Sequence, residues 1–335
     1  MYFRSRSLRL LMAVCAFAIL WMLVPKATFL PVLAESAQNA AKSSHGVVAF
    51  VLFSFSLLLQ ALPTAVFVAV QTAIVYFFSA FRIGLARGLI IIVSCLVGLM
   101  AIAGTIVWQF DIASKLGHYP NVMEHFYVLG HYYGPLKMPL SLLLILMFAT
   151  IGSLVSIRIK DKNILLPVVM FAAYVDFWTV TRGPVSAVME QAPEVVSAVS
   201  TPIPQAGAGV FMPVSMVGPG DFLFLAIVFA AVHKLSMRPA RNFWFVLAAM
   251  AIGMLAVVFG ILRFLPALVV LAIAVVAANW REFKLSRQEK ISTTIVAAVL
   301  LVSLPVIWSL FSAQTPAPEA DTSQSSTSTP APKPR

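Results

Sequence analysis

The chain has 335 residues, of which 61% are hydrophobic and only 10% are charged, and its mean hydropathy is +0.95. A soluble domain cannot bury so much apolar surface, so this composition excludes a soluble globular protein and indicates a polytopic membrane protein. The net charge of +11 does not indicate nucleic-acid binding, because the basic residues lie in short segments between apolar runs, where they act as topology signals.

Residues 1–46 are predicted to form a signal anchor, or a signal peptide, followed by an outer loop. Three arginines precede an apolar run over residues 10–24, and Val32-Leu33-Ala34 is similar to a small-residue cleavage site. We favour a retained anchor over a removed signal peptide. In both cases the segment that follows starts outside the membrane.

Residues 47–158 are predicted to hold the N-terminal transmembrane helices. The run from Val47 to Phe81 is longer than the ~20 residues of one span, yet too short for two spans and a turn. We therefore predict one helix, kinked at Pro63. Spans over 88–110 and 139–157 follow. Residues 111–137 between them are predicted to form an aromatic loop that carries His118, His125 and His131, and it is interpreted as an interfacial aromatic belt rather than a metal site.

The rest of the membrane part is predicted to be a transmembrane core over residues 159–281, which carries the motifs described below, and a final transmembrane helix over residues 282–312. The Pro/Ser/Thr-rich tail 313–335 is predicted to be disordered. The remaining apolar runs are 164–180, 218–232, 243–262, 264–278 and 295–311. The fold class is thus all-α and polytopic, with about nine transmembrane helices.

The basic residues predict the orientation. Under a nine-span topology, 15 of the 23 basic residues fall on one side, in five places: Arg4, Arg6 and Arg9; Arg82 and Arg87; Arg158, Lys160 and Lys162; Lys234, Arg238 and Arg241; Arg281, Lys284, Arg287 and Lys290. The positive-inside rule makes that side cytoplasmic, with the N-terminus inside and the C-terminus outside.

Two acids lie inside apolar runs, and a carboxylate in hydrocarbon is costly enough to indicate function. Asp176 lies late in a span that runs outward, and Asp221 begins the next span, which runs inward. Both therefore lie in the outer half of the membrane, where two nearby acids can share one proton and divide the roles of base and acid. A proton relay or an ion site in a transporter is the alternative.

The residues around Asp221 and a later motif give this pair a context. Gly218 and Gly220 flank Pro219 directly before Asp221, and we expect the two glycines to allow close approach of the backbone. Pro266-Ala267-Leu268 opens the eighth predicted span, again at the outer face. Alone, this tripeptide indicates no more than a proline in the first turn of a helix.

The order of these motifs resembles the presenilin and signal peptide peptidase family of intramembrane aspartyl proteases. Its hallmarks are Tyr-Asp in one span, Gly-x-Gly-Asp in the next, and Pro-Ala-Leu two spans later. Here Tyr174, with Val175 intervening, precedes Asp176; Gly218-Pro219-Gly220-Asp221 and Pro266-Ala267-Leu268 follow in the same order. The resemblance covers residues 164–278, includes Gly183-Pro184 and Glu190, and implies a divergent bacterial-type member with a presenilin-like catalytic half.

By this resemblance, Asp176 and Asp221 would be the catalytic pair. Tyr174, Gly218, Gly220, Pro266, Ala267 and Leu268 would shape the site and receive the substrate. Such an enzyme would hydrolyse transmembrane or signal-peptide-like segments with no cofactor and no metal, in the lipid bilayer of a bacterial plasma membrane. The predicted orientation is that of signal peptide peptidase, opposite to presenilin.

The segment 181–216 suggests how a substrate would be held. Residues 184–199 could form a short interfacial helix with Glu190 and Glu194, and the apolar stretch 207–216 could offer an edge strand to an unwound substrate. Other functions remain open, namely a transporter and a non-catalytic membrane scaffold. Prepilin peptidases also use a Gly-x-Gly-Asp acid, but they would not explain the Pro-Ala-Leu motif, and their cytoplasmic Cys motif is absent.

Overall fold

The computed structural model describes residues 2–110, 121–181, 191–208, 213–261 and 266–312. It is helical, as the apolar runs predict, apart from one two-stranded sheet. Within the described residues, five helical segments are long and apolar enough to cross a membrane: Arg6–Lys26, Gly46–Ser79, Leu85–Gln109, Lys137–Arg158 and Pro239–Val258. Leu165–Thr179 and Ala267–Asn279 are shorter apolar helices.

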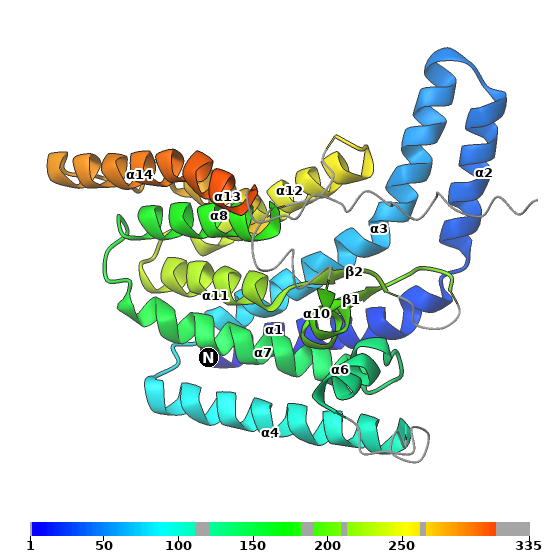
Figure 1. Cartoon of the computed structure of the whole chain (residues 1–335), viewed down its shortest axis with the longest axis horizontal. Helices are drawn as coiled ribbons and strands as arrows, with labels where there is room; N and C mark the ends of the chain where they lie inside the picture. Colours follow the sequence, from blue (N-terminus) through cyan, green and yellow to red (C-terminus); the bar gives the residue numbers. More distant parts are fainter. Residues whose placement is uncertain (1, 111–120, 182–190, 209–212, 262–265, 313–335) are drawn as a thin grey trace, which may run out of the picture.

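The N-terminal part consists of α1 (Tyr2–Leu23), α2 (Phe29–Ser43) and α3 (Gly46–Ser79). The prediction of a single helix through Pro63 is confirmed. With 34 residues, α3 is about 50 Å long, which exceeds a hydrocarbon core of about 30 Å. Its first part packs with α2 in a hairpin that projects from the other helices, and its second part runs among them (Figure 1).

The first helix belongs to the core. Phe17 and Trp21 of α1 pack against Phe67 of α3 with ring centroids 5.1 and 5.8 Å away, and Phe17 is fully buried. The cleavage-like residue Ala34 lies inside α2 and is also buried. Removing residues 1–34 would therefore remove core contacts.

The aromatic segment 111–137 is not simply a loop, because it contains α6 (Val122–His131) between α4 (Leu85–Phe110) and α7 (Lys137–Val155). Asn121 and Glu124 form a capping box that starts α6, with N–H to oxygen distances of 2.7 and 2.9 Å. The ring nitrogens of His125 and His131 lie 2.7 and 3.0 Å from backbone carbonyl oxygens one turn back. His118 lies outside the described residues.

The C-terminal part contains α8 (Leu165–Thr181), α10 (Pro193–Val199), α11 (Pro219–Lys234), α12 (Pro239–Val258), α13 (Ala267–Asn279) and α14 (Arg287–Ser312). Of the interfacial helix expected over 184–199, the described residues show a helical Gln191, a break at Ala192, and then α10. Gly183, Pro184 and Glu190 lie outside the described residues.

The expected edge strand is present in part, as β2 (Pro213–Val217). It pairs antiparallel with β1 (Thr201–Pro204), with Thr201 opposite Val217 and Ile203 opposite Ser215. Lys137 at the start of α7 joins α6 and α10, because its ammonium donates to the carbonyl oxygens of Leu129 and Ser197 at 2.9 and 3.4 Å.

Helix α11 is the centre of the packing. It contacts α7 and α3, while α13 packs between α8 and α12, and α14 covers α8 (Figure 1). Every residue of α11 from Phe224 to Val232 is buried. This explains why the run carries no polar side chain between Asp221 and His233: no face of it meets water.

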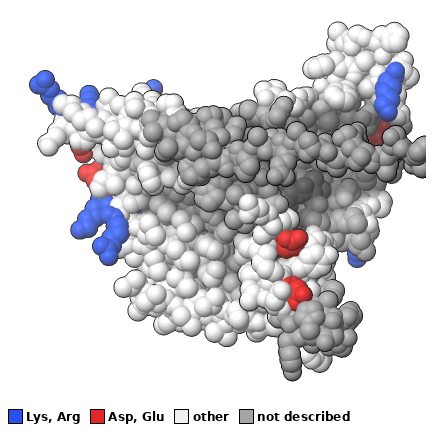
Figure 2. Space-filling model, viewed as in Figure 1, with Lys and Arg blue, Asp and Glu red and all other residues white. Residues whose placement is uncertain are grey.

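The basic segments that the charge pattern groups together meet at one end of the molecule. Lys162 and Arg238 both pair with Glu282, at 3.0 and 3.5 Å. At the same end, Lys234 donates to the carbonyl oxygen of Ile157 at 2.8 Å, and the Arg6 guanidinium donates to the carbonyl oxygen of Ala80 at 2.8 Å. The ion pair with Lys162 lowers the pKa of the Glu282 carboxyl group. Figure 2 shows Lys and Arg side chains gathered at the left end of the view, which agrees with the predicted topology.

Candidate active site

The first acid, Asp176, receives a hydrogen bond from the Pro-Ala-Leu motif. The backbone N–H of Leu268 donates to Oδ2 of Asp176 at 2.9 Å, across 92 residues of sequence. Pro266 is the N-cap of α13 and has an extended backbone, so Leu268 lies in the first turn of the helix. The N–H groups of a first turn have no partner within their helix, and the Leu268 amide is therefore available for a side chain.

The second acid, Asp221, lies in the first turn of α11. Its Oδ2 accepts a hydrogen bond from the backbone N–H of Gly218, the N-cap, at 3.3 Å. This contact resembles half of a capping box, and the positive end of the helix dipole further favours a carboxylate there. Each acid is thus oriented by a backbone amide and lies beside the N-terminus of a helix, α13 for Asp176 and α11 for Asp221.

The two acids lie near each other. The charge of Asp176 acts on the Asp221 carboxyl group, and both side chains are half-buried. Asp221 and Leu268 line the same cavity, whereas Asp176 lies beside it, bonded to the first turn of α13. Asp176, Asp221 and Leu268, one residue from each of the three motifs, are therefore brought together.

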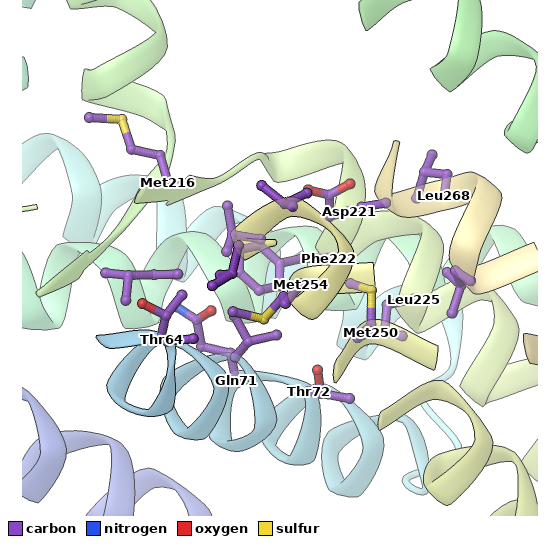
Figure 3. Close-up of a pocket in the computed structure, with 18 of the residues that line it drawn as sticks. Thr64, Gln71, Thr72, Met216, Asp221, Phe222, Leu225, Met250, Met254 and Leu268 are labelled. Atoms are coloured by element: carbon purple, nitrogen blue, oxygen red, sulfur yellow. The ribbon is translucent and has the colours of Figure 1, made fainter. Parts of the chain in front are cut away.

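The cavity has a volume of about 690 Å³ and is enclosed mainly by apolar side chains. Its walls come from α3, α11, α12, α13 and both strands of the sheet. Figure 3 shows Gln71, Thr64 and Thr72 on α3 at one wall, with Asp221 and Leu268 on the opposite side and Met216 toward one end. A volume of this size is ordinary for a cavity that binds a ligand.

Tyr174 is not brought to the acids. Its hydroxyl group forms a hydrogen bond with the Ser303 hydroxyl of α14 at 2.7 Å. Residues two positions apart on a helix differ by about 200° in direction, so Tyr174 and Asp176 face opposite ways. The intervening Val175 is the reason: a tyrosine directly before the acid would lie only about 100° away.

The expected close backbone approach at Gly218 and Gly220 is wrong. A Cβ atom at Gly220 would meet nothing within 4 Å, and one at Gly218 would lie 3.7 Å from Asp221 Oδ2, an ordinary contact. The glycine that fixes the position of α11 is instead Gly152 of α7. A Cβ atom there would overlap the carbonyl oxygen of Leu223 and lie 2.9 Å from Cβ of Ala226.

Sequence reasoning also missed Gln71, a polar residue inside the apolar run 47–81. Gln71 lines the cavity, is 1% exposed, and has no hydrogen-bond partner for either carboxamide atom in the described part of the chain. Its polarity within hydrocarbon was the available signal.

No group of three or more His, Cys, Asp or Glu side chains that could hold a metal ion occurs among the described residues. A comparison of the chain with protein-family models, curated proteins and solved structures gave no match. The argument for a function therefore depends on the geometry of the site.

Proposed function

We propose that the chain is an intramembrane aspartyl protease that hydrolyses peptide bonds of transmembrane or signal-peptide-like segments. One observation carries the proposal: the Leu268 amide binds Asp176, while Leu268 and Asp221 line one cavity. Three motifs far apart in the sequence thus converge, in the arrangement that the resemblance implies. A capping role for Asp221 alone would not require a second acid beside it.

The chemistry follows from two carboxyl groups in a poorly hydrated site. Like charges at close range cannot both ionise in low dielectric, so the pair holds one proton. The ionised member takes a proton from a water molecule as the water attacks the scissile carbonyl carbon. The protonated member gives its proton to the leaving amide nitrogen. The Leu268 and Gly218 amides keep the two carboxyl groups oriented.

The substrate would lie in the apolar cavity as an unwound segment. Among the described residues, β2 pairs with β1 only, and a substrate segment would pair with its second edge. Met216 and Val217 at the end of β2 line the cavity beside Asp221. Pairing with β2 would satisfy the backbone groups of a substrate helix that has been opened for hydrolysis.

We further propose nine spans, with the N-terminus and the basic end in the cytoplasm of a bacterial cell and the dyad in the outer half of the plasma membrane. The sharing of Glu282 by Lys162 and Arg238 supports this topology, because it joins segments that the charge rule assigns to one side. The partners would be transmembrane peptides and the lipid bilayer.

A transition-state analogue tests the proposal. Purified protein in detergent would be exposed to a hydroxyethylene peptide isostere that carries a photoreactive group. We expect the parent protein to be labelled, and labelling to be lost on competition with excess unlabelled isostere. We also expect loss of labelling in Asp176→Asn and in Asp221→Asn. Equal labelling of the parent and both variants would refute an aspartyl dyad.

A further inference from the structure

The carboxamide of Gln71 is an unusual group to find at this depth. Gln71 lies in the C-terminal half of α3, is 1% exposed, and leaves both Nε2 and Oε1 without a hydrogen-bond partner in the described residues. A buried amide without partners costs about 1–3 kcal/mol, and an apolar side chain of similar length would avoid that cost. Stability therefore does not explain the glutamine.

The other fully buried carboxamides of the described chain behave differently. Asn242 of α12 and Asn279 of α13 bond each other, with Nδ2 of Asn242 lying 3.0 Å from Oδ1 of Asn279. Asn242 Nδ2 also donates to the carbonyl oxygen of Met237 at 2.7 Å, and Asn279 Nδ2 to that of Val275 at 2.8 Å. Where the fold buries a carboxamide for structure, it satisfies it.

Gln71 belongs to a polar row on one face of α3. Gln60, Thr64, Gln71 and Thr72 all line the cavity, although α3 is otherwise largely apolar. Gln60 and Gln71 are separated by three helical turns, or about 16 Å, and so share a face. This face lies opposite Asp221 and Leu268 (Figure 3).

We propose that Gln71 binds the backbone of the substrate, with Oε1 accepting from one peptide N–H and Nε2 donating to a peptide carbonyl oxygen. The carboxamide offers one acceptor and a donor, which is the complement of a peptide unit. A helical segment has no free peptide unit, so Gln71 recognises the unwound form of an apolar peptide. The inference rests on the proposed function, and it adds a second polar wall across the cavity from Asp221.

The test combines two readouts on Gln71→Met, with Gln109→Met as the matched control because Gln109 is exposed on α4, away from the cavity. The first readout is thermal stability. Since methionine removes an unpaired buried amide, we expect the Tm of Gln71→Met to equal or exceed that of the parent. A lower Tm would mean that Gln71 has a structural partner and would overturn the proposal.

The second readout is the KM for an apolar transmembrane peptide and for a series in which single backbone N–H groups near the cleavage position become ester oxygens. We expect KM to rise about tenfold in Gln71→Met and to stay unchanged in Gln109→Met, because about 1.4 kcal/mol of hydrogen bonding is lost. One ester should impair the parent by a similar factor and have no added effect in Gln71→Met.

The outcomes separate this inference from the proposed function. Cleavage by the parent, combined with an unchanged KM in Gln71→Met, overturns the inference alone. If the effect of Gln71→Met on KM simply adds to the effect of every ester, Gln71 does not bond any of the replaced N–H groups, and the inference is also overturned. Failure of the parent to cleave any apolar transmembrane peptide overturns both.

Discussion

Replacing Gly152 by alanine tests the packing that positions Asp221. The added methyl would overlap the Leu223 carbonyl oxygen and lie 2.9 Å from Cβ of Ala226 and 3.1 Å from the backbone nitrogen of Ile227. Carbon atoms in contact prefer about 3.5–4.0 Å, so α7 and α11 would have to separate by about 1 Å. Backbone atoms cannot rotate away, and overpacking of this kind costs about 1–3 kcal/mol.

The expected result is a Tm several degrees below that of the parent protein, although alanine itself favours the helix by up to ~1 kcal/mol over glycine. Activity should fall too, because Leu223 is two residues after Asp221 on the same helix. The assay is thermal unfolding of the purified protein in detergent.

Two other glycines provide matched controls. A Cβ atom at Gly98 would come within 2.9 Å only of the end of the Leu143 side chain, which can rotate, and at Gly220 it would meet nothing within 4 Å. Gly98→Ala and Gly220→Ala should therefore keep the parent Tm or raise it slightly, since the added methyl has room and alanine favours a helix over glycine. A Gly152→Ala protein as stable as these two would refute the close contact between α7 and α11.

Leu268→Pro, in the first turn of α13 where proline is tolerated, removes the Leu268 amide donor to Asp176 and should reduce cleavage about tenfold or more, with helix content by circular dichroism unchanged. Unchanged turnover would show that this bond is dispensable. Lys162 holds the pKa of Glu282 below its ordinary value of 4.5, so the pair stabilises the protein at neutral pH and ceases to do so as the pH falls below that value. The Tm difference between the parent and Glu282→Gln should accordingly shrink on acidification, and a constant difference would contradict it. In a background with both native cysteines replaced, an impermeant thiol reagent on intact cells should label Gln205→Cys and spare Ala240→Cys, both at exposed positions. The reverse pattern would invert the topology.

The sequence predicted the helices well because apolar runs in a membrane protein leave few alternatives. The 47–81 run had a length that excluded two spans, and it is one helix through Pro63. The start of α6 also had a signal, since Asn121 and Glu124 have the spacing of a capping box. That signal was overlooked because aromatic residues and prolines dominate the segment.

The site was less predictable, because it depends on pairs of residues from different helices. A motif order could suggest that Asp176 and Leu268 meet, but no local pattern specifies the bond between them. The helical period does predict that Tyr174 points away from Asp176, because Val175 separates the two residues. The partner of Gly152 and the orientation of Gln71 are tertiary properties, which a single sequence does not encode in any short window.

Peptide cleavage by the purified protein in liposomes tests the central claim most directly. An apolar transmembrane peptide would be incubated with the parent, Asp176→Asn and Asp221→Asn, and both cleavage products would be measured by mass spectrometry. The dyad requires both acids, so the account predicts two matching fragments from the parent and loss of both fragments in each variant, with the parent Tm retained. Full cleavage by either single variant would contradict it.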